Sequence, residues 1–168
     1  MIIIGKVYKY GDFINTDVLY PGKYLNITDP QEMKLHALEG LDSEFVKNFK
    51  PGGIIVAGKF FGCGSSREQA ATALKYAGVG AVVAESFARI YFRNAINQGL
   101  PIVVCPKVSE FVNNGDEIKI DLKAGILDNL TQKKSLKFTP LPEFIMGILL
   151  SGGLIPYLKA KKSYAERV

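Results

Sequence analysis

Apolar runs and helical segments alternate through the central third of the sequence, and no other feature restricts the fold as strongly. We expect strands at 53–57, 79–84 and 100–105, with helices at 65–77 and 86–98 between them. Gly78 and Gly99 end the two helices, and the connections are short. Such strand–helix–strand units form parallel sheets, in which ligands bind at the carboxyl ends of the strands. The sequence therefore predicts an α/β fold whose site lies in loops that follow strands.

The flanking segments complete this picture. We expect a first strand at 2–10, an exposed turn-rich loop at 15–28, a helix that begins after Asp29 and ends at Gly40, an antiparallel hairpin at 117–130, and two helices after Pro140, the last at 154–161. The chain has no internal repeat and no long linker. Residues 1–168 are therefore predicted to form a single domain.

Composition excludes several classes of protein. Lys and Arg total 21 against 16 Asp and Glu, a net charge of +5, but the basic residues are scattered and no nucleic-acid motif is present. Cys63, Cys105 and His36 are too few for a zinc site or an iron–sulfur cluster, so we expect no metal bound by this chain. No stretch has the length of a signal peptide core or a membrane span, which predicts a cytoplasmic chain with reduced thiols and no membrane partner.

The segment 58–68 carries the strongest signal for chemistry. It joins a predicted buried strand to a predicted helix, and Gly62 and Gly64 let the backbone approach a ligand closely. Ser65, Ser66 and Arg67 add two hydroxyls and a guanidinium, which can hold a carboxylate through two parallel hydrogen bonds. This pattern predicts an anion site. A purely structural alternative makes Ser65 a helix N-cap with Glu68 closing a capping box.

Several spaced motifs identify a family. They are 62–70 (GCGSSREQA), 85–90 (ESFARI), 93–101 (RNAINQGLP), Gly11-Asp12 and Asn15-Thr16-Asp17. Together they resemble the swivelling domain of the aconitase superfamily, and most of all the free-standing small subunits of 3-isopropylmalate dehydratase and its relatives. The resemblance implies a three-layer β/β/α domain with a central parallel sheet and an additional antiparallel sheet.

The resemblance also implies a function. The chain would be the small subunit of a hydro-lyase that isomerises 2-isopropylmalate to 3-isopropylmalate in leucine biosynthesis, inactive without a large subunit that carries a four-iron four-sulfur cluster. One iron would act as a Lewis acid toward the substrate. Ser65 takes the role of catalytic base, Arg67 binds a substrate carboxylate, Ser66 supports the same loop, and Thr16 and Asp17 line or support the site.

Substrate selection is expected in the turn-rich loop, at Tyr24, Leu25, Asn26 and Ile27. Homoaconitase-type relatives resemble Tyr-Leu-Arg-Thr here, whereas isopropylmalate enzymes have an apolar residue in place of the arginine. Asn26 matches neither pattern, but the missing arginine disfavours a substrate with an additional carboxylate. We therefore expect a small dicarboxylic hydroxy acid, isopropylmalate first, with dimethylmalate, methylmalate/citraconate or homoaconitate as alternatives.

The sequence also permits other interpretations of these residues and of the function. Arg89 and Asn94 belong to the family pattern and can face either the substrate or a partner. A non-enzymatic anion-binding module would use the same loop, and a serine acyl-transfer enzyme is disfavoured because no histidine lies near Ser65 and no Gly-x-Ser-x-Gly motif is present. Apolar surface left for the large subunit predicts that the isolated chain forms a homo-oligomer.

Overall fold

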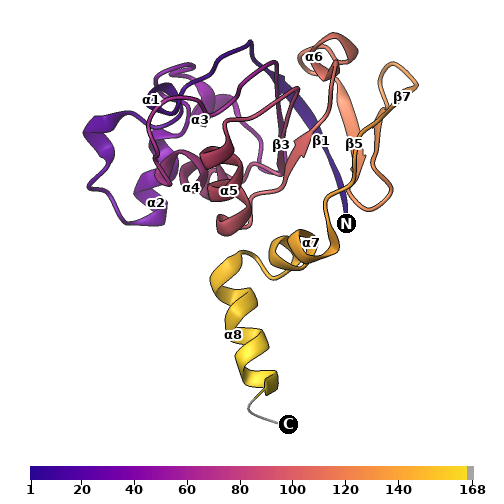
Figure 1. Ribbon diagram of the computed structural model, residues 1–168. Coiled ribbons are helices and arrows are strands. Elements are labelled where there is room, and N and C mark those ends of the chain that lie inside the picture. Colours follow the sequence, from indigo (N-terminus) through magenta and orange to yellow (C-terminus); the bar gives the residue numbers. More distant parts are fainter. Residues whose placement is uncertain (166–168) are drawn as a thin grey trace.

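A single mixed sheet organises the computed structural model, which describes residues 1–165 (Figure 1). Its strands are β1 (Ile2–Lys9), β2 (Ile54–Ala57), β3 (Ala81–Ala84), β4 (Ile102–Val104), β5 (Glu117–Asp121), β6 (Ile126–Asn129) and β7 (Lys134–Lys137). The order across the sheet is β4-β3-β2-β1-β5-β6-β7. Strands β1 to β4 pair in parallel, and β5 to β7 continue from β1 in antiparallel pairs. The predicted parallel and antiparallel parts are thus confirmed, with β1 common to both.

The helices lie mainly between the parallel strands in the chain. They are α1 (Thr16–Leu19), α2 (Pro30–Met33), α3 (Phe45–Asn48), α4 (Gln69–Tyr76), α5 (Arg89–Gln98), α6 (Val108–Phe111), α7 (Glu143–Leu150) and α8 (Leu154–Ala165), with 3-10 turns at Gly22–Tyr24 and Lys34–His36. In Figure 1, α2, α4 and α5 gather on one side of the parallel strands, and β5 to β7 lie on the other.

Two hydrophobic cores give the fold its three layers. Because successive side chains of a strand point to opposite faces, Ile55 and Val82 pack against the helices, while Ile54 and Val83 pack against the antiparallel strands. Ile118, Ile120 and Leu127 of β5 and β6 belong to this second core. The antiparallel half therefore curls over the face of the parallel sheet that the helices leave uncovered, as expected for a β/β/α domain.

The C-terminal helices attach at a close backbone contact. A Cβ added to Gly99 would lie 2.4 Å from the carbonyl carbon of Gly152, so the contact requires a glycine there. Lys75 Nζ donates to the Gly152 carbonyl at 2.9 Å and ties α4 to the turn between α7 and α8. From this turn α8 projects away from the body (Figure 1). Within the described residues no single helix is long and apolar enough to cross a membrane; α7 and α8 satisfy that test only as a pair bent by 95°.

Local structure differs from the prediction in several places, among them α5, which begins at Arg89 and not at 86 because Ser86 Oγ accepts from the Phe60 N–H instead of capping the helix. The segment 15–28 is not simply exposed: it contains the helical turn α1, whose last residue Leu19 and C-cap Tyr20 are fully buried. The helix after Asp29 ends at Met33, and the chain reaches Gly40 through a 3-10 turn and Leu38, whose backbone is left-handed (φ 59°). Strand β7 was not predicted because its residues are nearly all polar, and only its pairing with β6 defines it.

A buried carboxylate organises the turn before β5. Asp116, 6% exposed, accepts hydrogen bonds from the Asn113 backbone N–H (2.9 Å), from Asn129 Nδ2 (2.7 Å) and from Gln132 Nε2. Burial alone would raise the pKa of Asp116, but these hydrogen bonds outweigh it and lower the pKa below its usual value.

We predict that Asp116→Ala lowers the free energy of unfolding by about 2–4 kcal/mol, because three donors, including the buried Asn129 amide, lose their acceptor. Urea denaturation of both proteins at neutral pH measures this difference. Because the pKa of Asp116 is lower in the folded chain than the unfolded value of about 3.9, the ionised carboxylate stabilises the fold above that pH. This stabilisation is lost as the carboxylate is protonated, so the difference in unfolding free energy between the two proteins should shrink below about pH 4. A difference that stays constant down to pH 2 would contradict this account of Asp116.

Candidate active site

The loops after β1, β2 and β3 lie side by side at the carboxyl ends of the parallel strands. The Gly62 N–H donates to the Ile14 carbonyl at 2.8 Å, and the Thr16 N–H donates to the Cys63 carbonyl at 2.8 Å. On the other side, the Ala88 N–H donates to the Phe61 carbonyl at 2.9 Å. Backbone pairing therefore continues beyond the strands and fixes the segment 61–63 between two neighbours, at the edge of the sheet where the sequence predicts a site.

Gly62 lets this segment pass directly over α5. Its backbone is left-handed (φ 74°), and a Cβ added there would lie 2.1 Å from Tyr91 Cγ. Both features favour glycine, since other residues are strained at this φ and no space exists for a side chain. The predicted close approach of the backbone is therefore a close approach to Tyr91.

We expect Gly62→Ala to lower the free energy of unfolding by about 2–4 kcal/mol through overpacking and backbone strain. Gly11→Ala is the matched control, because nothing lies within 4 Å of a Cβ added at Gly11. That control should change stability by less than about 0.5 kcal/mol. Thermal or urea unfolding of the two variants measures these losses. Equal losses of stability for Gly62→Ala and Gly11→Ala would show that the close contact with Tyr91 does not require a glycine at position 62.

Ser65 does not cap a helix. The helix α4 begins at Gln69, four residues later than predicted, and its N-cap Glu68 makes no side-chain capping bond. Glu68 Oε1 instead accepts from Gln98 Nε2 at 2.5 Å. The expected helix start at Ser65 and the capping-box alternative were therefore wrong, because the chain leaves the 61–63 pairing through Gly64 (φ 89°) and turns before the helix starts. Ser65 and Ser66 are exposed in this turn.

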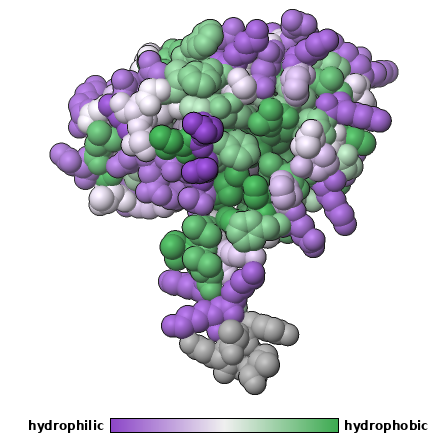
Figure 2. Space-filling model, viewed as in Figure 1, coloured by the Kyte–Doolittle hydropathy of each residue, from purple (hydrophilic) through white to green (hydrophobic). Residues whose placement is uncertain are grey.

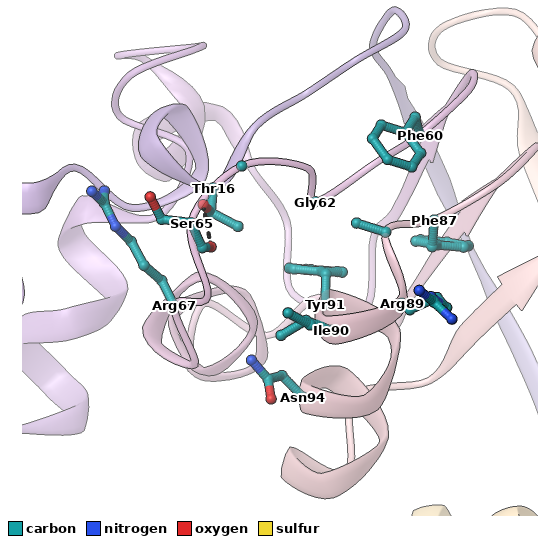
Figure 3. Close-up of a pocket in the computed structure, with 12 residues that line it drawn as sticks. Thr16, Phe60, Gly62, Ser65, Arg67, Phe87, Arg89, Ile90, Tyr91 and Asn94 are labelled. Carbon is teal, nitrogen blue, oxygen red and sulfur yellow. Dashed lines mark hydrogen bonds between the residues drawn. The ribbon is translucent and has the colours of Figure 1, made fainter.

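Thr16 holds the Ser65 turn in place. Its side chain is buried, and Thr16 Oγ1 donates to the Ser65 carbonyl at 2.8 Å, the dashed line in Figure 3. The Ser65 backbone is thus anchored through its carbonyl. Within the described chain, the Ser65 hydroxyl has no hydrogen-bond partner, and it lies at the cavity described below.

Arg67 is positioned by the loop after β1. Its Nη1 lies 2.6 Å from Asp17 Oδ1 and donates to the Tyr20 carbonyl at 3.3 Å. Its Nη2 lies 3.5 Å from a Cβ built on Gly22. The Arg67 side chain is 18% exposed, whereas that of Asp17 is 57% exposed. The predicted residues Asp17 and Arg67 are therefore brought together, with Asp17 holding one edge of the guanidinium.

A cavity of about 370 Å³ opens between these loops and α5 (Figure 3). Its lining residues are Thr16, Phe60, Gly62, Gly64, Ser65, Arg67, Phe87, Ala88, Arg89, Ile90, Tyr91 and Asn94. Among the predicted site residues, Thr16, Ser65 and Arg67 line it, while Ser66 and Asp17 do not. In Figure 3, Asn94 projects from α5 toward the Arg67 side, and Arg89 points away from Ser65.

Sequence reasoning missed the apolar part of the cavity wall. Phe60 is 46% exposed with a left-handed backbone (φ 58°), and Ile90 is 53% exposed on α5. Phe87 and Tyr91 lie between them and form a pair of parallel rings with centroids 6.5 Å apart. The only signal for these residues in the sequence was their place inside or beside the family motifs.

Residues 24–27, the loop predicted to select the substrate, lie near Arg67 but outside the cavity. Tyr24 OH donates to Glu39 Oε1 at 2.8 Å, and Gln69 Nε2 donates to the Leu25 carbonyl at 3.4 Å. Asn26 is exposed and Ile27 half-buried. The loop thus contacts the start of α4 and the neighbourhood of Arg67, but none of the residues 24–27 lines the cavity.

The chemistry available on this wall is that of an anion site with a hydroxyl. A guanidinium, an exposed serine hydroxyl and an amide, from Asn94, converge on a cavity with an apolar rim. The described residues contain no group of three or more His, Cys, Asp or Glu side chains that could hold a metal ion. His36 does not line the cavity and is bonded to Glu39 instead, so this structure offers Ser65 no histidine partner for acyl transfer.

Comparisons with known proteins agree on one family. The family model described as the aconitase C-terminal domain matches residues 14–107, more than half of the chain. A 3-isopropylmalate dehydratase small subunit from Caldicellulosiruptor saccharolyticus is 53% identical over 96% of this chain and 93% of its own length. An isopropylmalate/citramalate isomerase small subunit from Methanocaldococcus jannaschii is 52% identical over 98% of both chains. A crystal structure of 3-isopropylmalate dehydratase from the same organism superposes with a TM-score of 0.94, at 44% identity and 99% coverage of both chains.

Proposed function

Because the chain belongs to the 3-isopropylmalate dehydratase small-subunit family of the aconitase superfamily, we propose that its Ser65–Arg67 turn forms one wall of the active site. The chain is a subunit of a hydro-lyase and works with a large subunit. The reaction isomerises 2-isopropylmalate to 3-isopropylmalate in leucine biosynthesis by dehydration and rehydration. The observation that carries the site assignment is the convergence of Thr16, Ser65 and Arg67 on one cavity.

Ser65 is proposed to take the proton from the substrate carbon next to a carboxylate. Its hydroxyl is exposed to the cavity, and its backbone is fixed by Thr16, so the oxygen has a defined position. A serine oxygen needs stabilisation of its anionic form to act as a base, and we assign this role to the Arg67 guanidinium, which lines the same cavity and lies two residues away in the sequence. The hydroxyl of the neighbouring carbon leaves as water, protonated by a group of the large subunit, which gives the unsaturated intermediate. On rehydration water adds its hydroxyl to the carbon that lost the proton, while Ser65 returns a proton to the neighbouring carbon.

Arg67 is proposed to bind a substrate carboxylate. Asp17 and the Tyr20 carbonyl occupy Nη1 and fix the plane of the guanidinium, so its remaining N–H groups are held ready for a second acceptor. A planar, bidentate contact of this kind orients the substrate as well as binding it. Ser66 supports the turn from outside the cavity.

For the substrate we propose a small malate with an alkyl group. The apolar wall of Phe60, Phe87 and Ile90 suits a branched alkyl chain, and no arginine stands at Asn26 to receive an additional carboxylate. One relative is named for both isopropylmalate and citramalate, so citramalate is the first alternative. Discrimination among these substrates is assigned to Tyr24, Leu25, Asn26 and Ile27, which abut the Arg67 region.

The large subunit is proposed to contribute a four-iron four-sulfur cluster. The described residues of this chain do not fit such a group, since Cys63 and Cys105 are both free and belong to no set of metal ligands. When present, the cluster supplies Lewis-acid chemistry to the substrate. A cytoplasmic location is part of the same proposal, supported by the two free thiols.

A substrate panel tests this assignment. The assembled enzyme, with its cluster reconstituted anaerobically, is given 2-isopropylmalate, dimethylmalate, citramalate and homocitrate in separate reactions. We expect the highest kcat/KM with 2-isopropylmalate and the lowest with homocitrate. A preference for homocitrate would overturn the role given to Asn26.

The isolated chain is expected to self-associate. Phe144 and Leu150 of α7 and Ile155 and Leu158 of α8 are each at least 50% exposed, and Figure 2 shows apolar surface where α8 leaves the body. Patches of this kind seldom stay uncovered. Sedimentation of the purified chain should give a mass of at least two copies at micromolar concentration, and a monomer at all concentrations would refute the expectation.

A further inference from the structure

Three polar side chains surround Glu39, outside the cavity. His36 Nδ1 lies 2.7 Å from Glu39 Oε2, Tyr24 OH donates to Glu39 Oε1 at 2.8 Å, and Lys23 Nζ lies 3.2 Å from the same oxygen. The His36 ring also stacks on the Tyr24 ring, with centroids 3.5 Å apart and planes 15° apart. The only histidine of the chain and a half-buried tyrosine are therefore held by one carboxylate.

This cluster binds two separate segments together. Lys23 and Tyr24 belong to the turn after α1, whereas His36 and Glu39 follow α2. The Glu39 side chain is 30% exposed and that of His36 is 20% exposed, so water competes only partly for these bonds. Burial would raise the pKa of Glu39, but the bonds from His36, Tyr24 and Lys23 outweigh it and lower the pKa. Glu39 is thus a charged acceptor at neutral pH.

The cluster is connected to Arg67 by a short series of contacts. The Tyr24 carbonyl accepts a hydrogen bond from Tyr20 OH at 3.1 Å, and the Tyr20 carbonyl accepts from Arg67 Nη1. Gly22, between the two tyrosines, lies next to the Arg67 guanidinium, since a Cβ added there would be 3.5 Å from Arg67 Nη2. The segment 20–24 is consequently held at one end by Glu39 and touches the proposed carboxylate-binding group at the other.

We propose that Glu39 is a positioning residue for substrate selection, because its carboxylate fixes the 20–27 loop against Arg67. The inference rests on the proposed function, in which Arg67 binds the substrate and residues 24–27 discriminate its variable group. Glu39 itself touches neither the cavity nor the substrate. It acts by reducing the number of conformations available to the loop.

Glu39→Gln tests the proposal, since it keeps the shape of the side chain but removes the charge that pairs with Lys23. In the assembled enzyme we expect KM for 2-isopropylmalate to rise about 10-fold with kcat within twofold, and the kcat/KM ratio of 2-isopropylmalate to citramalate to change about fivefold. Glu44→Gln is the matched control, because Glu44 is exposed just before α3 and, among the described residues, its carboxylate pairs only with Lys47. That control should leave both quantities unchanged.

Tyr24→Phe removes one hydroxyl from the same cluster and provides a second measurement. If Glu39 acts through Tyr24, the double variant should show less than the sum of the two single effects on selectivity. If the effects of the two substitutions on selectivity simply add, Glu39 does not act through Tyr24 and the proposal is contradicted. A fall in kcat with KM and selectivity unchanged would also overturn the proposal, since it would mean a general structural effect.

Hydrogen exchange tests the role of Glu39 in fixing the loop independently of enzyme activity. Backbone amides of residues 20–27 should exchange at least about 10-fold faster in Glu39→Gln than in the wild-type chain or in Glu44→Gln. Unchanged exchange would overturn the positioning role whether or not the enzyme turns over. If the wild-type enzyme converts none of the substrates but exchange rises as expected, the proposed function fails while the role of Glu39 in fixing the loop is supported.

Discussion

Replacing Ser65 with alanine is expected to reduce kcat of the assembled enzyme by about 10²–10⁴-fold, the usual contribution of a positioned general base. The change should leave the fold and subunit assembly intact, because the Ser65 side chain has no hydrogen-bond partner in the described chain. The bond that anchors the turn uses the Ser65 carbonyl, which alanine retains. Steady-state kinetics with 2-isopropylmalate, and sedimentation of the complex, measure the two parts of this prediction.

Ser66→Ala is the control for Ser65→Ala. Ser66 has the same side chain, lies in the same exposed turn and does not line the cavity. We expect its kcat to stay within about 10-fold of the wild-type value. Should Ser65→Ala retain more than about a tenth of the wild-type kcat, or should Ser66→Ala be the more damaging change, the catalytic base would have to be sought elsewhere.

Arg67→Lys is expected to lower kcat/KM by about 100-fold or more. Lysine keeps the positive charge but cannot offer a planar pair of donors to a carboxylate, and it cannot bond both Asp17 and the substrate through one rigid fork. Losing a hydrogen-bonded charge partner in a partly buried site has effects of this size. The loss should appear mainly in KM, because Arg67 is proposed to bind the substrate in the ground state as well as during the reaction.

Arg93→Lys serves as the reference for Arg67→Lys. Arg93 is an exposed arginine of α5 that does not line the cavity with Ser65. Its substitution should change kcat/KM less than about fivefold. Similar losses for the two variants would indicate a general requirement for basic surface and would contradict a specific carboxylate contact at Arg67.

The parallel core could be predicted from the sequence because its signals are local. Runs such as Ile54–Ala57 and Ala81–Ala84 are apolar throughout and buried on both faces, and glycine ends each intervening helix. Strand β7 has no such signal, since Lys134–Lys137 is defined by pairing with β6 alone. The burial of Leu19 and Tyr20 likewise depends on packing beneath α1 that a turn-rich sequence does not reveal.

The same distinction between local and long-range features applies to the candidate site. The turn with Ser65 and Arg67 was identified because its residues are adjacent in the sequence and match a family motif. The contact of Asp17 with Arg67 and the cluster at Glu39 join segments that are far apart, so only the structure shows them. Ser65 looked like a helix cap because hydroxyls before a helix usually are caps, whereas here Gly64 redirects the chain first.

The most direct test of the account mixes purified chain and large subunit. With the cluster reconstituted anaerobically, conversion of 2-isopropylmalate to 3-isopropylmalate is followed for each subunit alone, for the mixture, and for the mixture made with Ser65→Ala. We expect no turnover by either subunit alone, turnover in the mixture that rises to saturation as the wild-type chain is added to a fixed amount of large subunit, and a rate about 10²–10⁴-fold lower with Ser65→Ala. Turnover by the large subunit alone, or undiminished turnover with Ser65→Ala, would contradict the claim that this turn forms one wall of the active site.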